Sequence, residues 1–228
     1  MSPRATRAVL LDALGTLLAL EPPGPPLRQE LRRRGLDVSL EEAERAVAAE
    51  IAYYRQHHLE GFDARSLAGL RERCAAVLRD ALPGGNRLAL GDALDALMAS
   101  LRIRAYEDAA PALRELRSLG LRLVVVSNWD FSLHERLAES GLRDLVDGAV
   151  SSAEAGAEKP APGAFRAALA IAGVPAAQAL HVGDAPVEDV EGARSAGIQP
   201  VLLSRQGGEA PPGVRRIRSL RELPDLAA

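Results

Sequence analysis

A strand-like segment runs directly into a helix-like one over residues 179–197, which read Ala-Leu-His-Val-Gly-Asp-Ala-Pro-Val-Glu-Asp-Val-Glu-Gly-Ala-Arg-Ser-Ala-Gly. The short apolar run Ala179–Val182 is typical of a buried strand. A helical pattern follows from Val187 to Ala196 and ends at Gly197. Because glycine just past a helix is the usual left-handed C-terminal cap, the stretch predicts a strand followed by a helix.

The same unit recurs along the chain. Further strand-like apolar runs occur at Ala8–Leu11, Leu121–Val126, Gly148–Val150 and Pro200–Leu203, and helical patterns over Pro111–Ser118, Phe131–Ser140 and Pro162–Ala172 end at Gly120, Gly141 and Gly173. The apolar runs are continuous rather than alternating, as expected for a parallel sheet covered on both faces. Strands and helices that alternate in this way predict an α/β fold with a Rossmann-like, doubly wound parallel sheet.

Residues 18–105 have a different pattern, without a convincing strand. The segment Glu21–Pro26 reads Glu-Pro-Pro-Gly-Pro-Pro and predicts a stiff linker. Ser39 with Glu42 three residues later predicts a capping box at a helix start. Helices are expected over Leu27–Arg34, Glu41–His58, Ala64–Leu82 and Leu88–Leu101. We therefore expect an all-helical cap domain, 18–105, inserted into a core domain of 1–17 and 106–228.

The composition limits the kinds of partner. Hydrophobic residues make up 47% and charged residues 26% of the 228 residues, which is typical of a globular protein. The formal net charge of -3 provides no broad basic field, so no nucleic-acid partner is expected. The apolar run Ala8–Leu20 is interrupted by Asp12 and is too short to span a membrane. The single cysteine, Cys74, excludes a disulfide within the chain, and a cytoplasmic location is expected.

The use of basic residues singles out one position. The chain has 28 Lys and Arg residues, and Lys159 is the one lysine among them. A lysine kept where the chain otherwise uses arginine suggests a need for a compact ammonium, which a planar guanidinium cannot replace.

Four polar stretches fall at the carboxyl ends of predicted strands, where open α/β sheets place their sites. They read Leu10-Leu-Asp-Ala-Leu-Gly-Thr-Leu17, Val126-Ser-Asn-Trp-Asp130, Glu158-Lys-Pro160 and His181-Val-Gly-Asp-Ala-Pro-Val-Glu-Asp189. In this order, with a helical insert after the first, they resemble the four motifs of the haloacid dehalogenase-like (HAD) hydrolase superfamily. The resemblance covers nearly the whole chain and is closest to the subfamily whose cap lies between the first and second motifs.

These residue types also suit the chemistry of such a site. A carboxylate such as Asp12 can attack phosphorus or a saturated carbon and form a covalent intermediate. Ser127 and Lys159 offer a donor and a cation for a bound phosphate, and Asn128 offers a further donor or supports these residues from behind. The carboxylates of Asp12, Asp184 and Asp189, with the backbone carbonyl of Leu14, are hard oxygen ligands of the kind that Mg²⁺ takes.

The resemblance implies the same roles. It makes Asp12 the nucleophile, Ser127 the phosphate binder, Lys159 the charge clamp and Asp184 a ligand of the cofactor Mg²⁺. The second acid of the last motif, Asp189, would bind the metal directly, act through water or brace the loop. The expected substrate is a small phosphorylated molecule.

One position departs from the family pattern. Phosphatases of the superfamily look like Asp-x-Asp-x-Thr in the first motif, and the second Asp serves as general acid and base. Here that position is Leu14, and losing a general acid or base typically costs about 10²–10⁴ in rate.

Three interpretations follow from Leu14. The chain is a slow or specialised Mg²⁺-dependent phosphate ester hydrolase, a relative of the 2-haloacid dehalogenases, or a non-catalytic phosphate- or metabolite-binding relative. The dehalogenases need no protonated leaving group, but they lack a metal site and a Gly-Asp fourth motif. The presence of Asp12, Lys159 and Asp184 favours the first interpretation.

A polar and aromatic cluster in the insert consists of Tyr53, Tyr54, Arg55, His57 and His58. Packed tyrosines and exposed histidines on an amphipathic helix account for it. Helical spacing also puts Tyr54, His57 and His58 on one face, which would then look into the cleft.

Overall fold

The computed structural model describes residues 6–227, which divide into two compact units. Residues 6–19 and 104–227 form the core unit, and Leu20–Ile103 form the helical unit. The sequence-based boundaries, 18 and 105, lie within two residues of this division.

The core unit contains a six-stranded sheet in the order β5-β4-β1-β6-β7-β8, and all its strand pairs are parallel. The strands are β1 (Ala8–Leu11), β4 (Arg122–Ser127), β5 (Gly148–Ser151), β6 (Ala179–Gly183), β7 (Gln199–Leu203) and β8 (Arg215–Ile217). Every residue of β1 and β6 is buried, as the continuous apolar runs predict. The predicted fold class is confirmed.

The strand register brings the polar motifs to one edge of the sheet. Leu11 of β1 pairs with Val125 of β4 on one side and with Val182 of β6 on the other. These three neighbouring strands therefore end side by side. The polar motifs begin at these ends, with Asp12, Ser127 and Gly183. In a parallel sheet this carboxyl edge is the usual place for a site.

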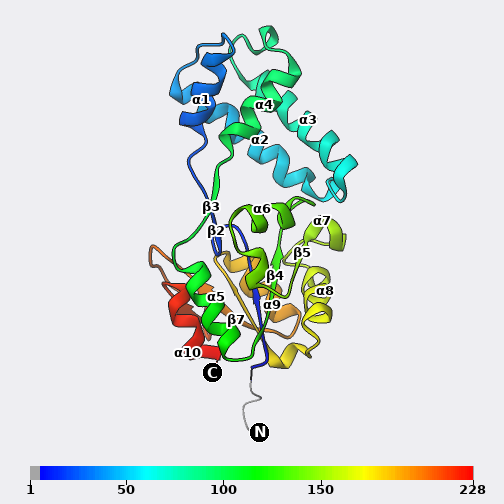
Figure 1. Ribbon diagram of the computed structural model, residues 1–228, viewed down its shortest axis with the longest axis vertical. Helices are drawn as coiled ribbons and strands as arrows, with labels where there is room; N and C mark the ends of the chain where they lie inside the picture. Colours follow the sequence, from blue (N-terminus) through cyan, green and yellow to red (C-terminus); the bar gives the residue numbers. More distant parts are fainter. Residues whose placement is uncertain (1–5, 228) are drawn as a thin grey trace. The chain divides into compact units, whose positions relative to one another are not determined.

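Helices cover both faces of the sheet (Figure 1). One face carries α5 (Ala109–Ser118) and α10 (Leu223–Ala227), and the other carries α8 (Pro162–Ala172) and α9 (Gly192–Ser195). Phe165 of α8 is fully buried in a cluster with Leu10 and Val124 of the sheet. Burying a side chain of this size stabilises the fold by roughly 1.5–3 kcal/mol. The remaining short helices of the core unit are α6 (Leu133–Glu139), α7 (Ser152–Ala155), η3 (Arg143–Leu145), η4 (Ala176–Gln178) and η6 (Leu220–Glu222).

The helix predicted over residues 187–196 is wrong in detail. The segment instead forms a π-helix, η5 (Pro186–Glu191), and then the short α9. The backbone amides of Asp189 and Val190 both donate to Ala185 O, at 2.9 and 3.3 Å. Such wide turns are frequent at functional sites. The edge strand β8 was not predicted, because its three residues are mostly charged.

The helical unit has a hydrophobic core of its own. Its helices are α1 (Gly24–Arg33), α2 (Leu40–His57), α3 (Ala64–Ala81) and α4 (Leu90–Ser100), with η1 (His58–Glu60) and η2 (Gly85–Arg87) between them. Leu31, Leu70 and Leu97 from different helices are buried together in this core. Cys74 is buried there as well. The predicted capping box of Ser39 and Glu42 begins α2.

Two predictions about the ends of the insert need correction. The expected linker over residues 21–26 is short, because α1 already begins at Gly24 with prolines in its first turn. Proline fits that turn, since its missing N–H would have no partner there. The strands β2 (Leu18–Leu20) and β3 (Ile103–Ala105) form a separate two-stranded sheet. Three-residue strands give too little pattern for detection.

The polar and aromatic cluster also differs from its prediction. Tyr53 stacks on His57 with ring centroids 4.2 Å apart, and Tyr54 lies 6.0 Å from His58. His58 is buried, whereas the His57 side chain is about one-third exposed. The cluster contains two ring pairs, each four residues apart, and the expectation of exposed histidines is wrong for His58.

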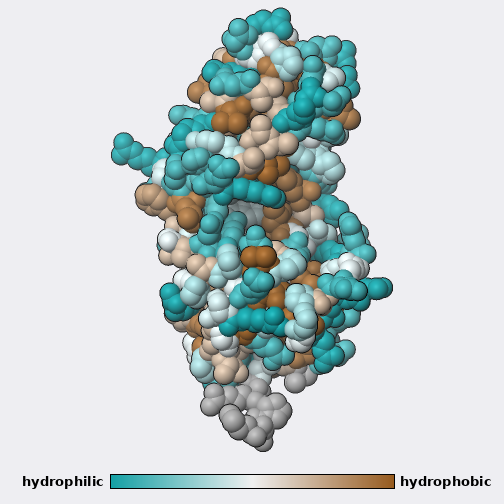
Figure 2. Space-filling model, turned by 180° about the vertical axis from the view of Figure 1, so that it is seen from behind, coloured by the Kyte–Doolittle hydropathy of each residue, from teal (hydrophilic) through white to brown (hydrophobic). Residues whose placement is uncertain are grey.

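Two further features are the polarity of the surface and the apolar length of the helices. Hydrophilic residues cover most of the face shown in Figure 2, and hydrophobic residues form separate groups among them. None of the helices in residues 6–227 has the length and apolar character that crossing a membrane requires.

Candidate active site

Asp12 lies at the centre of the site. It follows β1 directly, its backbone amide donates to Val182 O at 2.9 Å, and the residue is buried. The chain then turns tightly, because Ala13 O accepts hydrogen bonds from the amides of Leu17 and Leu18. Gly15 has a φ of 88° in this turn, a conformation that favours glycine. The carboxylate is thus held by both the sheet and the turn.

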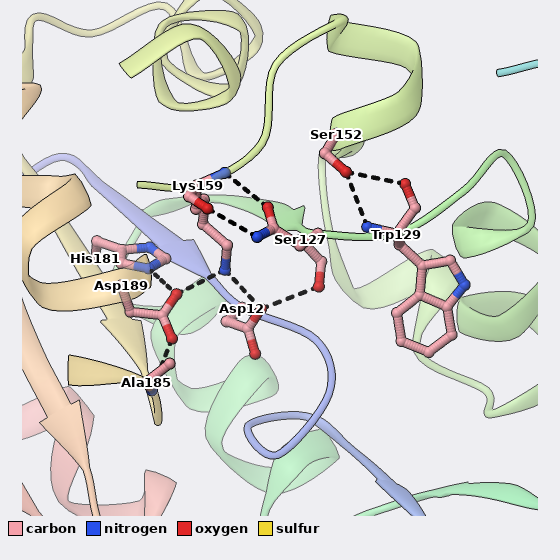
Figure 3. Close-up of polar contacts among 9 residues, drawn as sticks. Asp12, Ser127, Trp129, Ser152, Lys159, His181, Ala185 and Asp189 are labelled. Carbon is pink, nitrogen blue, oxygen red and sulfur yellow. Dashed lines mark hydrogen bonds and ion pairs between the residues drawn. The ribbon is translucent and has the colours of Figure 1, made fainter. Parts of the chain in front are cut away.

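The side chain of Lys159 lies between two carboxylates. Its Nζ donates to Asp12 Oδ1 at 2.7 Å and to Asp189 Oδ1 at 2.6 Å (Figure 3). The lysine side chain is 2% exposed. Burial alone would lower the pKa of Lys159, but the two negative charges outweigh it and raise the pKa. Lys159 is therefore a permanent ammonium in contact with Asp12.

Ser127, the last residue of β4, also contacts Asp12. Its Oγ donates to Asp12 Oδ1 at 3.0 Å. Burial raises the pKa of Asp12, and the Lys159 charge opposes that shift. Within residues 6–227, the hydrogen bonds to this carboxylate end on Oδ1. Asp12 Oδ2 is consequently the oxygen placed to attack a substrate or to bind a metal.

Of the two roles expected for Asn128, substrate donor or supporting residue, its contacts are those of a supporting residue. Its Nδ2 donates to Lys159 O at 2.9 Å, and Lys159 N donates back to its Oδ1 at 2.7 Å. The amide therefore fixes the backbone that carries Lys159. Next to it, Ser152 braces the Trp129 backbone through hydrogen bonds of 3.1 and 3.2 Å (Figure 3). Asp130 accepts from Ser132 N at 2.7 Å, the contact between residues i and i+2 that forms an Asx turn.

Both carboxylate oxygens of Asp189 accept hydrogen bonds. Oδ1 is bound by Lys159 and lies 2.9 Å from His181 Nε2, while Oδ2 accepts from Ala185 N at 3.0 Å. Burial would raise the pKa of Asp189, but Lys159 and His181 lower it. A Cβ at Gly183 would lie 2.1 Å from the Asp189 Cγ, so only glycine permits this approach. The arrangement suits a residue that braces Lys159.

His181 is a neighbour that the sequence analysis quoted without a role. It is fully buried, and its ring meets Phe165 edge-on at 5.0 Å. The sequence signal that could have identified His181 is its position as a single histidine in a strand that is otherwise apolar. Its ring nitrogen fixes Asp189 from the side opposite the Ala185 amide (Figure 3).

Asp184 lies over the turn that follows Asp12. A Cβ at Gly15 would lie 2.1 Å from Asp184 Oδ2, so the turn and the carboxylate pack directly together. Desolvation raises the pKa of Asp184 to about 6, and the negative charges of Asp12 and Asp189 add to the shift. Although the residue as a whole is exposed, its carboxylate is close to two other acids.

The three acids form a cluster that fits a divalent cation. One carboxylate oxygen from each of Asp12, Asp184 and Asp189 lies within 4.8 Å of the others. Three carboxylates and the ammonium of Lys159 give these four side chains a formal charge of -2. Hard oxygen ligands with unbalanced negative charge suit Mg²⁺.

Leu14 is exposed in the same turn. The residue is 41% exposed, whereas Leu17 and Leu18 of the same turn are fully buried. The structure brings Asp12, Ser127, Lys159, Asp184 and Asp189 into one cluster, with Asn128 bound to the Lys159 backbone and Leu14 exposed in the turn after Asp12.

Arg205 supports the turn, and the sequence offered no signal for it. Its guanidinium donates to Thr16 O at 2.8 Å and to both oxygens of Asp108, at 2.8 and 3.0 Å. It also lies 3.7 Å from the centre of the Tyr106 ring. These partners are up to 189 residues away in the sequence. Arg205 therefore joins the turn after Asp12 to the chain that returns from the helical unit.

Comparisons with known proteins agree on one family. The model of the haloacid dehalogenase-like hydrolase family matches residues 6–197. The glyceraldehyde 3-phosphate phosphatase of Methanopyrus kandleri is 30% identical over 210 residues, which cover 87% of this chain and 84% of that protein. A crystal structure of the L-2-haloacid dehalogenase RSc1362 superposes with a TM-score of 0.69 at 25% identity, covering 98% of this chain and 99% of that one.

Other relatives match over a shorter region. The zebrafish (Danio rerio) haloacid dehalogenase-like hydrolase domain-containing protein 3 is 38% identical over 123 residues, or 52% of this chain and 51% of that protein. The chain thus spans about half the length of this curated relative. The family match covers most of the sequence, including all four motifs at the carboxyl edge of the sheet. The chain therefore belongs to the haloacid dehalogenase-like hydrolase family.

Proposed function

We propose that this hydrolase is a Mg²⁺-dependent phosphatase that hydrolyses a small phosphorylated molecule through an aspartyl-phosphate on Asp12. The observation that carries the proposal is the cluster of Asp12, Asp184 and Asp189, whose charge Lys159 balances only in part. A site for transferring a phosphoryl group needs this combination of hard ligands and a fixed cation. The similarity to a glyceraldehyde 3-phosphate phosphatase supports it.

Each side chain has a defined part in the reaction. Asp12 Oδ2 attacks phosphorus, the bond to the leaving oxygen breaks, and the phosphoryl group is transferred to Asp12. Water then attacks phosphorus, releasing inorganic phosphate and the Asp12 carboxylate. Ser127 and Lys159 would bind the phosphoryl oxygens from the side of Asp12 Oδ1. Mg²⁺, when bound by Asp12, Asp184, the Leu14 carbonyl and Asp189, supplies positive charge that offsets the charge of the phosphoryl group.

A second candidate function is 2-haloacid dehalogenation, in which Asp12 attacks carbon and halide departs. Leu14 favours it, because a halide leaving group needs no proton. The likeness to the L-2-haloacid dehalogenase RSc1362 is consistent with it. The cluster of three acids favours the phosphatase, since attack at carbon has no use for a divalent cation.

An assay against phosphate esters and 2-haloacids, each with Mg²⁺ and with a chelator, separates these functions. Phosphate release that requires Mg²⁺ supports the phosphatase. Halide release in the presence of chelator supports the dehalogenase. Inactivity on both panels, with phosphate binding by calorimetry, supports a non-catalytic binding protein.

We also propose that residues 18–105 act as a cap that closes over the site, with hinges near Leu18–Pro26 and Arg104–Asp108. Closure would exclude water from the reaction, as lids commonly do. Hydrogen exchange with and without orthovanadate and Mg²⁺ tests this. Slower exchange in both hinge segments supports closure, whereas unchanged exchange there contradicts it.

A further inference from the structure

We infer that the substrate releases an acidic leaving group, as an acyl phosphate, an enol phosphate or a phosphoanhydride does, rather than an alcohol. The inference rests on the proposed phosphatase function. It follows from the partners of the four titratable residues that form the site with Asp12, namely Lys159, Asp184, Asp189 and His181, and from the hydrocarbon that Leu14 exposes two positions after Asp12. Taken together, these groups provide charge for the phosphoryl group and no proton for the leaving oxygen.

Lys159 is committed to two carboxylates. Its Nζ lies 2.7 Å from Asp12 Oδ1 and 2.6 Å from Asp189 Oδ1, and the side chain is 2% exposed. Donating its proton to a leaving group would leave two carboxylates without their shared cation in a buried setting, which is costly. Lys159 also approaches Asp12 on Oδ1, together with Ser127, rather than from the turn that carries Leu14.

The other titratable groups near Asp12 have fixed partners as well. Asp189 accepts hydrogen bonds on both oxygens, and it is 1% exposed. His181 is fully buried, and its Nε2 contacts Asp189. Neither residue can reach a leaving group that departs into solvent. Asp184 lies over Gly15 within the acid cluster, where its carboxylate would bind the proposed Mg²⁺.

The exposed residue of the turn is Leu14. It lies two positions after Asp12, and it is 41% exposed, so this position of the turn presents hydrocarbon rather than an acid to solvent. This side chain can contact an apolar leaving group by dispersion, but it cannot protonate one. Among the described residues of the core unit, the contacts around Asp12 therefore include no spare acid.

The chemistry then limits the substrate. When the bond from phosphorus to the leaving oxygen breaks, the electron pair stays on that oxygen, and the group departs as an oxyanion. A carboxylate, enolate, phenolate or phosphate is stable in that form, whereas an alkoxide is not. A general acid is worth about 10²–10⁴ in rate, so alcohol phosphates should be slower by about that factor.

The test is the dependence of kcat/KM on the pKa of the leaving group. The probes are a series of substituted phenyl phosphates, acetyl phosphate, pyrophosphate and glycerol phosphate, each with Mg²⁺. We expect log kcat/KM to fall steeply, by about half to one unit for each unit of leaving-group pKa, as Brønsted behaviour without an acid requires. Comparing kcat/KM for acetyl phosphate with kcat/KM for pyrophosphate shows whether the enzyme prefers acyl phosphates or phosphoanhydrides.

Two matched variants complete the test. At a pH low enough to protonate the new carboxyl, Leu14→Asp should flatten the dependence and accelerate glycerol phosphate hydrolysis most. Leu14→Asn, of the same size as Asp but without an acidic proton, should keep the wild-type slope at every pH. A shallow slope in the wild-type protein overturns the inference and leaves the phosphatase function standing. The absence of Mg²⁺-dependent hydrolysis of every phosphate overturns both. The wild-type slope decides the matter even where a variant fails to fold.

Discussion

The side-chain amide of Asn128 forms two hydrogen bonds with the backbone of Lys159. Asn128 Nδ2 donates to Lys159 O at 2.9 Å, and Lys159 N donates to Asn128 Oδ1 at 2.7 Å. The pair connects the end of β4 to the loop before α8, 31 residues apart. Asn128 is accordingly a positioning residue for the Lys159 ammonium.

Replacing Asn128 with Ala should lower kcat with little change in KM. The Lys159 backbone would lose both partners, and supporting residues of this kind are typically worth about 10–100-fold. The measurement is a double-mutant cycle with Lys159→Met on p-nitrophenyl phosphate. The Asn128→Ala effect should vanish in the Lys159→Met background. Equal effects in both backgrounds would show that Asn128 acts on the substrate itself.

Lys159→Arg should fail to preserve activity although it keeps the charge. The ammonium occupies a buried space between Asp12 and Asp189, and the guanidinium is larger and spreads its charge. We expect a loss of roughly 10²–10³ in kcat, comparable to the loss of a transition-state donor. Arg33→Lys on the exposed surface of α1 is the matched control and should have no effect. Full activity of Lys159→Arg would disprove the argument from the single lysine.

Mg²⁺ binding should weaken as the pH falls through about 6, the raised pKa of Asp184. Below that pH the carboxyl is protonated and is no longer a ligand, so the affinity should drop by roughly tenfold per pH unit. Calorimetric titration with Mg²⁺ between pH 5 and 8 measures this change. An affinity independent of pH over that range would exclude Asp184 from the metal site.

Asp184→Asn should stabilise the metal-free protein above pH 6 while it abolishes Mg²⁺ binding. A folded-state pKa above the unfolded value means that the native state binds more protons, so stability falls as the pH rises from about 4 to 6. The variant removes this repulsion. After discounting for solvent screening, the gain is on the order of 1 kcal/mol, or about 2–4 °C in Tm. Thermal unfolding at pH 8 with a chelator should detect it, and a lower Tm would contradict the repulsion.

Leu14→Asp should raise kcat for an aryl phosphate whose leaving group barely needs an acid. The new carboxylate would act as a base in the hydrolysis of the aspartyl-phosphate, and the neighbouring positive charges of Lys159 and Mg²⁺ favour its ionised form. The double variant with Asp12→Asn should be inactive, and so should Leu14→Asp without Mg²⁺. If Leu14→Asp folds, binds Mg²⁺ and is no faster, a missing base does not limit turnover.

Arg205→Lys should destabilise the protein and loosen the turn after Asp12. A lysine cannot bind both oxygens of Asp108 and Thr16 O at once, and it loses the flat stacking on Tyr106. Urea unfolding of Arg205→Lys, Asp108→Asn and the double variant should give a coupling free energy of about 1–3 kcal/mol. Additive effects would mean that the pair is independent.

The sequence by itself determined the fold class and most of the elements. Buried parallel strands require continuous apolar runs, and helices between them end at glycine, so both leave local patterns. The strand over residues 8–11 and the helix over 162–172 have the predicted bounds. The motif residues Asp12, Ser127, Lys159 and Asp184 were recognisable because the four polar stretches together resemble the motifs of the family, and the ends of parallel strands that meet at one edge are the usual place for such a site.

Tertiary structure alone decided which atoms these residues contact. The sequence left Asn128 as either a donor or a support, and the fold binds it to the Lys159 backbone. His181 and Arg205 serve the site from positions that no local pattern marks. The π-helix that places Asp189 also has no signature in the helical spacing of the sequence. The reason is physical: periodicity records which side of an element is buried, whereas hydrogen bonds between residues 31 to 189 positions apart depend on packing that only the folded chain brings about.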